Sequence, residues 1–321
     1  MSSDSAATSG DRATSGPAPS APALPLAGYG LALAGATLFA AKSVIVKIAY
    51  AAGIDAETLL ALRMGLSLPF YLVIGLLAAG RVVRQGGRLP RGMALAKAAG
   101  VGMLGYWFSS YADFLGLTYI SASFARLILF TYPLFVVLFG AVLFGLPVRR
   151  RALVAFAVAY AGLALIFAEN LSVSGTDTVR GTVLVLMAAV SFALYQLCAR
   201  PLIAGMGAPI FTCIAMTAAA MVALGQFLAL RPVSALAVDG RMWAIGLTLA
   251  LGATVLPSFL MNAALQRISA QANATIGTIS PVVTMVLAVL LLGESVTGVE
   301  LAGALVVVAS IGWYTLADSR R

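Results

Sequence analysis

Long apolar runs separated by short polar segments set the hydrophobic pattern of the chain. A helix that crosses a bilayer needs about 20 mainly apolar residues, and ten runs approach or exceed that length. They cover residues 28–51, 56–79, 94–118, 122–145, 152–168, 181–203, 207–230, 242–264, 270–292 and 297–317. No segment between these runs is long enough for a soluble domain. The pattern therefore predicts an all-α membrane protein with ten transmembrane helices.

The composition indicates that lipid is the main solvent of the chain. Of its 321 residues, 61% are hydrophobic and 10% are charged, and the mean hydropathy is +1.02. Soluble domains contain about 25% charged residues. Residues 1–27 differ, because they are rich in Ser, Ala, Pro and Gly, which predicts a disordered tail. The apolar run after this tail is too long for a signal peptide, so we expect it to be retained as the first membrane helix.

The positions of Lys and Arg predict the orientation in the membrane. The formal net charge is +9, but the basic residues lie in short loops between apolar runs, which indicates topology and argues against nucleic-acid binding. With the N-terminus inside, three of the twenty Lys and Arg residues lie within helices, four lie outside and thirteen lie inside. The outer four are Lys47, Arg180, Arg231 and Arg241. This bias predicts a multi-pass protein of the inner or plasma membrane with both termini cytoplasmic.

The chain lacks the residue sets that most enzymes and metal sites require. It has no His, and its two Cys residues, Cys198 and Cys213, lie in apolar runs without the spacing of a zinc or redox site. It has no phosphate-binding loop of the nucleotide-hydrolase type and no clustered pair of carboxylates. We therefore expect no enzyme activity, no cofactor and no metal. The expected partners are a small-molecule substrate and the bilayer, and nothing in the sequence supports a homodimer.

Two segments of the chain resemble each other at a constant offset of 148 residues. Residues 117–146 read LTYISASFARLILFTYPLFVVLFGAVLFGL, and residues 265–294 read LQRISAQANATIGTISPVVTMVLAVLLLGE. Both contain an Ile-Ser-Ala turn, a proline within the run and a glycine near its end. Residues 38–47 and 191–200 also align. The repetition predicts two related halves.

Each predicted half contains five helices. The first covers residues 28–168 and the second covers residues 180–317. Because five is an odd number, the second half must be inverted relative to the first. Two inverted repeats are the plan of many secondary transporters, whose sites lie at the repeat interface.

These motifs together resemble the EamA type of the drug/metabolite transporter superfamily. The resemblance covers 28–317 and is carried by the segments ALRMGLSLP, GLTYISASFARLILFTYP and ISAQANATIGTISPVVTMVLAVLLLGE, which begin at residues 61, 116 and 268. It implies an inverted five-plus-five architecture, alternating access and transport of small metabolites, often outward. It also implies a central cavity lined largely by the first, third, fourth, sixth, eighth and ninth helices.

The sequence departs from the family pattern in two places. Leu146 follows Gly145 where the family often has Gly-Glu, whereas the second half keeps Glu294 after its glycine. The first helix has Ala40 and Ala41, followed by a charge, where the family often has Trp-Gly. The substrates of better-known relatives are therefore not carried over to this chain.

Four charges lie at membrane depth: Lys42, Arg63, Asp113 and Arg126. At ~1.5 Å rise per residue, the last three lie ~10 Å below the outer helix ends and the lysine ~13 Å below. Such charges are costly in lipid and persist where they pair or line a polar cavity. One interpretation pairs Asp113 with Arg126 as a structural bolt, with Arg63 and Lys42 extending outward. The other is a positive patch that binds an anionic group.

Several uncharged residues complete the predicted substrate site. They are Tyr111, Tyr195, Gln196, Asn262 and Asn273, of which the amides could instead hold helices together.

Pro133 and Pro281 lie in the middle of predicted helices at matching positions of the repeat. Proline removes a backbone hydrogen bond and kinks a helix, so we predict a gating role for both. The predicted function is a secondary transporter, an exporter by resemblance, of a small polar metabolite that is amino-acid-like or carries an anionic group. A channel-like facilitator of the same fold is the alternative.

Overall fold

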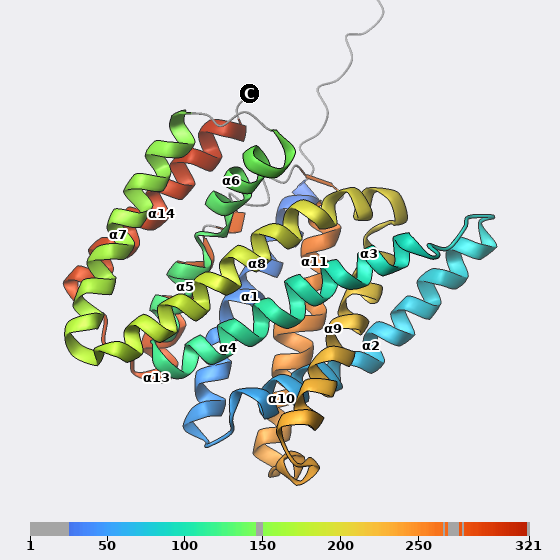
Figure 1. Ribbon diagram of the computed structural model, residues 1–321, viewed down its shortest axis with the longest axis horizontal. Helices are drawn as coiled ribbons and strands as arrows, with labels where there is room; N and C mark the ends of the chain where they lie inside the picture. The colour runs from blue at the N-terminus through green and yellow to red at the C-terminus, as the bar shows by residue number, and fades with distance from the viewer. Residues whose placement is uncertain (1–25, 146–149, 266, 269–275, 278, 320–321) are drawn as a thin grey trace, which may run out of the picture.

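The computed structural model describes residues 26–145, 150–265, 267–268, 276–277 and 279–319 (Figure 1). Within these ranges the secondary structure is helical and contains no strand. The predicted tail lies outside them, apart from its last two residues. The helices are α1 (Leu26–Ala51), α2 (Ala56–Arg84), α3 (Met93–Gly102), η1 (Met103–Phe108), α4 (Ser109–Tyr119), α5 (Ala122–Leu129), α6 (Tyr132–Phe144), α7 (Arg150–Ser174), α8 (Thr176–Met206), α9 (Ala208–Leu230), η2 (Val233–Leu236), α10 (Gly240–Ala250), η3 (Leu251–Val255), α11 (Leu256–Leu265), α13 (Ile279–Leu292) and α14 (Gly298–Ser319).

Among the described residues, seven helical segments are long and apolar enough to span a membrane. They are Leu26–Ala51, Ala56–Arg84, Ala122–Leu143, Leu153–Ser172, Thr176–Met206, Ala208–Leu230 and Gly240–Ala264. Two shorter apolar helices cover Ile279–Leu292 and Gly298–Trp313. The protein is therefore an all-helical membrane protein.

The predicted run 122–145 consists of two helices. α5 ends before Phe130, and α6 begins at Tyr132 with Pro133 in its first turn. Proline fits this position because its missing N–H would have no partner in the first turn of a helix. Pro133 thus begins a helix instead of kinking one. Pro281 likewise lies in the first turn of the described part of α13.

The predicted loop 169–180 is largely helical. α7 continues to Ser174 and α8 begins at Thr176, so the turn is at Gly175, which has a φ of 56°. Hydropathy identifies only the apolar part of a helix that lies in lipid. These two helices continue beyond that part through polar residues, so the apolar runs were shorter than the helices. Glycine suits the turn because side chains disfavour positive φ.

The helices pack in corresponding sets. α2 packs on α9 and α7 on α14. α4 packs on α8 while α11 packs on α1, and α5 packs on α8 while α13 packs on α1. In Figure 1, α7 and α14 lie side by side at one edge, away from α2 and α9.

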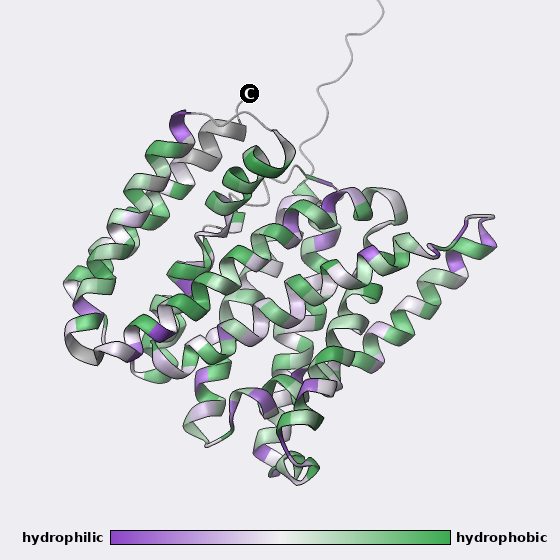
Figure 2. Cartoon of the chain, viewed as in Figure 1, coloured by the Kyte–Doolittle hydropathy of each residue, from purple (hydrophilic) through white to green (hydrophobic). Residues whose placement is uncertain are grey.

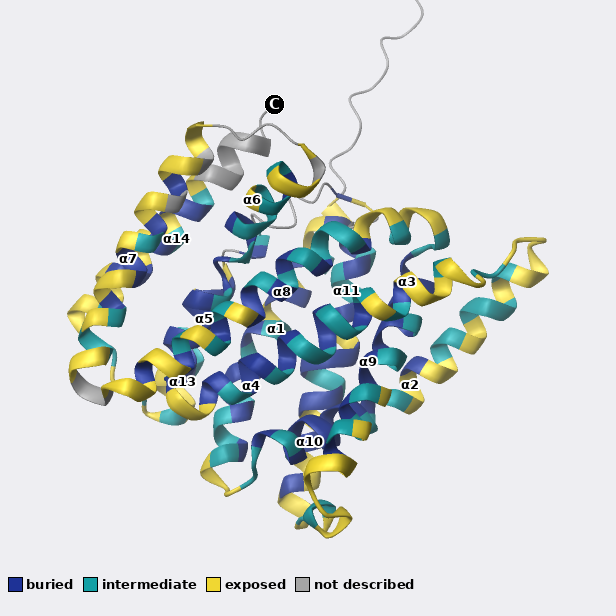
Figure 3. Cartoon of the chain, in the orientation of Figure 1, coloured by how far each residue is buried: buried dark blue, intermediate teal, exposed yellow. Residues whose placement is uncertain are grey.

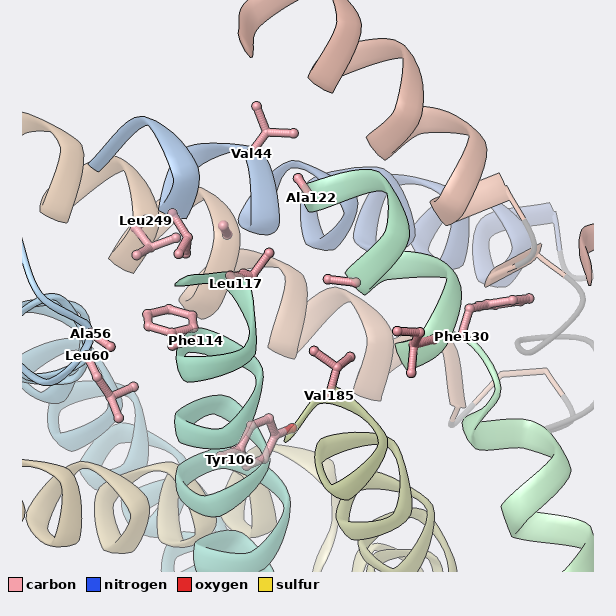
Figure 4. Packing of buried hydrophobic residues seen from close by; sticks show 14 of the residues in the cluster. Val44, Ala56, Leu60, Tyr106, Phe114, Leu117, Ala122, Phe130, Val185 and Leu249 are labelled. Carbon is pink, nitrogen blue, oxygen red and sulfur yellow. The ribbon is translucent and has the colours of Figure 1, made fainter. Parts of the chain in front are cut away.

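Apolar side chains cover the outside of the helices as well as the core. In Figure 2 hydrophobic residues extend along most helices, and purple gathers at ends such as the turn between α2 and α3. Figure 3 shows the buried residues concentrated in the central helices and exposed ones along α7 and α14. The core brings together Val44 of α1, Phe114 and Leu117 of α4 and Val185 of α8 (Figure 4).

Two π-helical segments interrupt the membrane helices. η1 begins at Met103 and η3 at Leu251, so their starts are 148 residues apart, the offset of the sequence repeat. π-Helical turns are rare and occur frequently at functional sites. Here they adjoin the cavity described next.

Candidate functional site

A cavity of about 550 Å³ lies among α1, α2, α5, α8 and α11. Its volume is within the range of small-molecule sites, ~300–1,000 Å³. Residues of η1, α4, α6 and α13 also line it. Its wall contains Lys42, Arg63, Arg126 and Arg200, and no acidic residue among the described lining.

Six of the nine predicted substrate-binding residues line this cavity: Lys42, Arg63, Arg126, Tyr195, Gln196 and Asn262. Tyr111 does not, because its hydroxyl donates to Glu57 Oε1 over 3.3 Å. The face it shares with Trp107 packs toward α9, where Trp107 Nε1 donates to Gln226. Asn273 lies outside the described residues.

Asp113 lies behind the cavity wall as the partner of Lys42. Lys42 Nζ is 2.7 Å from Asp113 Oδ2, and the side chains are 10% and 2% exposed. This ion pair, between α1 and α4, replaces the Asp113–Arg126 bolt that the sequence suggested. Helical rise predicts how deep a charged residue lies, but not which neighbouring helix it faces. In the structure the Asp113 carboxylate faces Lys42 of α1.

The two arginines bond to hydroxyl groups from the other half of the chain. Arg63 Nε donates to Thr254 Oγ1 over 2.7 Å, and Arg126 Nε donates to Ser280 Oγ over 3.1 Å. Arg63 is 2% exposed and lies with its guanidinium 5.4 Å from the Phe114 ring centroid. It therefore points inward, which excludes the alternative in which it extends to the membrane surface.

Other polar side chains join the helices around the cavity. Asn262 Nδ2 donates to Thr212 Oγ1 over 2.6 Å. The hydroxyls of Tyr106 and Tyr195 share a hydrogen bond of 2.9 Å. Asn262 and Tyr195 thus line the cavity and also hold helices together.

Aromatic rings form one side of the cavity wall. Tyr132 and Phe192 have ring centroids 4.9 Å apart, and Phe192 stacks on Tyr195 with centroids 5.6 Å apart. Phe130 also lines the cavity. These rings can hold an apolar part of a ligand by contact with their faces.

The cavity lining reaches an exposed residue, and a carboxylate contact lies outside that lining. The exposed residue is Arg200. At the start of α5, the backbone N–H of Ala122 and the hydroxyl of Ser123 donate to Glu294, over 2.8 and 2.9 Å. Glu294 follows α13, so this contact ties the end of α13 to the beginning of α5.

The family model for the EamA-like transporter family matches residues 26–168 and 179–316. The chain belongs to the EamA-like transporter family. Membership in this family implies a multi-pass membrane transporter rather than an enzyme.

Two individual proteins are similar to the chain. The chain is 28% identical over 285 residues to the "Uncharacterized transporter YcbK" of Bacillus subtilis (strain 168), covering 84% of this chain and 87% of that protein. A solved structure described as "Crystal structure of protein" matches with a TM-score of 0.64 and 18% identity, over 92% of this chain and 98% of that one. The latter shows a shared fold.

Sequence reasoning did not assign Phe130, Tyr132, Phe192 or Arg200 of this EamA-like transporter to the site. Arg200 aligns with Lys47 in the repeat, and it was used only as one of the basic residues that predict the orientation in the membrane. Tyr132 directly precedes Pro133, and this proline was the sequence signal for the break between α5 and α6. The sequence also held a signal for Phe192. In the alignment of residues 38–47 with 191–200, Phe192 matches Phe39, and both line the cavity.

Proposed function

We propose that the protein is a secondary transporter that moves a small polar metabolite carrying an anionic group across the inner or plasma membrane by alternating access. The observation that carries this proposal is a cavity whose described wall holds four basic residues and no acidic one. A guanidinium group in such a site binds carboxylate or phosphate oxygens through paired hydrogen bonds.

The architecture we propose is ten membrane helices in two inverted five-helix repeats, 28–168 and 180–317. The corresponding helix contacts and the two π-helices at matching positions support it. So do pairs of lining residues 148 apart: Ser110 with Ser258, and Tyr132 with Ser280. Sites between inverted repeats suit alternating access, because one half can rock against the other.

We place both termini in the cytoplasm, from the excess of Lys and Arg in the inner loops. The end of the cavity at Arg200 then faces the cytoplasm, and the Glu294 contact lies on the outer side. A cytoplasmic metabolite could enter this conformation directly, which favours export.

Counterflow in proteoliposomes tests the proposal against a channel-like facilitator. Metabolite profiles of cells lacking or overproducing the protein would supply candidate solutes. A transporter gives saturable uptake that unlabelled solute on the opposite side accelerates, whereas linear flux without such acceleration indicates a facilitator. In the same assay the double variant Lys42→Met with Asp113→Asn, which removes the ion pair without leaving either charge alone, should transport more slowly. Unchanged uptake across the tested solutes would exclude a binding role for Lys42.

A further inference from the structure

The charges around the cavity do not balance. Three cations, Lys42, Arg63 and Arg126, face one carboxylate, Asp113, so the group carries a formal charge of +2. Asp113 lies 2.7 Å from Lys42. Neither arginine forms an ion pair with any described residue. Asp113 acts electrostatically on both arginines as well, but this single carboxylate is shared by three cations, so two positive charges remain uncompensated.

Burial makes this imbalance expensive. Arg63 is 2% and Arg126 8% exposed, and a buried charge without a counter-charge is strongly disfavoured. Among the described residues, Nη1 of Arg63 has no hydrogen-bond partner. The neutral hydroxyls of Thr254 and Ser280 orient the two side chains without neutralising them. Both guanidinium groups are thus held in place while their charges stay available.

The two guanidinium groups are anchored at separate places. Arg63 of α2 bonds to η3, whereas Arg126 of α5 bonds to α13. Both act electrostatically on Lys42, so the ammonium group belongs to the same charged cluster. A ligand with two negative groups could meet both guanidinium groups at once, whereas a ligand with one would leave a buried charge uncompensated.

We infer that the substrate is a small organic dianion, of the dicarboxylate kind, bound between Arg63 and Arg126. This inference rests on the proposed transport function and narrows its substrate class. The aromatic wall formed by Tyr132, Phe192 and Tyr195 contacts the carbon body of the ligand. A phosphate monoester also carries about two negative charges, but both lie on one group. It is therefore the second ligand class to compare with a dicarboxylate.

Thermal unfolding of the full-length protein in detergent, at low ionic strength, tests the inference with four probes. Succinate carries two separate negative groups, glycerol 3-phosphate one doubly charged group, lactate one negative charge, and leucine no net charge. A ligand that binds the folded state raises the unfolding temperature. Succinate should act at concentrations about tenfold or more below those of lactate, because one charged contact is worth roughly that factor.

Single variants link the preference to the arginines. Arg63→Gln and Arg126→Gln should each reduce the preference for succinate over lactate about tenfold. Arg63→Lys keeps the charge and should retain part of that preference. Arg180→Gln is the matched control, because Arg180 lies outside the cavity lining with its side chain 64% exposed, and it should change nothing.

Each result has a distinct meaning. A stronger effect of glycerol 3-phosphate than of succinate would identify a phosphate ester as the dianion. Equal effects of succinate and lactate, or a preference for leucine, would overturn the inference whether or not the variants fold, since the wild-type protein decides it. If counterflow shows transport of leucine but no competition by succinate, the dianion is wrong and the transporter stands. If counterflow moves no candidate solute, the proposed function itself fails.

Discussion

The first half of the chain supplies the buried charges of the cavity, and the second half supplies neutral groups at corresponding positions, with the exposed Arg200 as its one charged lining residue among those described. Lys42 aligns with Tyr195, and both line the cavity. Asp113 corresponds to Met261 at the offset of 148. The second half instead provides hydroxyls, such as that of Ser280, which bond to the arginines of the first half. Positions that align in the sequence repeat thus carry different chemistry: the first half holds the buried charges, and hydroxyls of the second half orient the arginines.

The strongest test of this difference is the carboxylate of Asp113. Asp113→Asn leaves Lys42 without a counter-charge and raises the formal charge of the cluster from +2 to +3. Breaking a buried pair in this way typically destabilises a protein by about 3–5 kcal/mol. Thermal unfolding in detergent should show a large decrease in the unfolding temperature.

The double variant Lys42→Met with Asp113→Asn is the informative comparison for stability. It should recover most of the lost stability, because replacing a whole buried pair is often nearly neutral. The exposed pair of Asp177 and Arg180 gives a control, since its side chains are 53% and 64% exposed and Asp177→Asn should have little effect. Equal losses in the single and double variants would show that the pair does not account for the effect.

The sequence predicted the depth of the charges better than their partners. Apolar runs and helical rise were sufficient to place Arg63 and Arg126 at one depth and Lys42 ~3 Å deeper, and the structure brings them to one cavity. The facing direction was not predictable, because helices that are apolar on all sides carry little signal for their rotation. Tyr111 lies four residues after Trp107 and shares a helix face with it, but that face packs against other helices.

The two π-helices offer a second contrast between the halves. A Cβ added to Gly105 in η1 would lie 2.2 Å from the Tyr195 ring, whereas one added to Gly252 in η3 would meet no heavy atom within 4 Å. Gly105→Ala should therefore destabilise the protein by about 1–3 kcal/mol through overpacking and displace Tyr195 at the cavity wall. Gly252→Ala changes the same residue type in the same kind of helix and should be close to neutral. Thermal unfolding compares the two, and similar losses would show that backbone conformation, and not packing, requires glycine.

The carboxylate at the end of α13 is a third difference, because the corresponding residue of the first half is Leu146. Glu294→Gln weakens a contact with two backbone N–H groups and one hydroxyl at the start of α5. Losing a hydrogen bond to a charged group costs about 1.5 kcal/mol, roughly tenfold in an equilibrium. The start of α5 and the end of α13 should then separate more often, which would open a path to the cavity from this side.

Thiol labelling measures that opening. In a variant in which Cys198 and Cys213 are replaced by alanine, Leu129→Cys on the cavity wall reports access. An impermeant reagent added outside intact cells should label it several times faster with Glu294→Gln. Glu300→Gln, which changes a carboxylate bonded to Thr297 outside the cavity, should leave the rate unchanged. An unchanged rate with Glu294→Gln would show that this contact does not control access to the cavity.

The smallest expected effect concerns the beginnings of two equivalent helices. α2 is capped by the preceding Asp55, whose carboxylate accepts from the Thr58 N–H over 2.9 Å. α9 is preceded by Gly207 and has no side-chain cap. Asp55→Ala should cost about 1 kcal/mol at neutral pH. Burial tends to raise the pKa of Asp55, but the hydrogen bonds from Thr58 outweigh burial, and the pKa is lowered. A lowered pKa in the folded state means that the stabilisation is complete above the unfolded value, ~3.9, and is lost as the pH falls through the folded value. The difference in unfolding temperature between wild type and Asp55→Ala should therefore shrink as the pH is lowered. If this difference stays constant with pH, the cap acts through hydrogen bonding and not through the charge of the carboxylate.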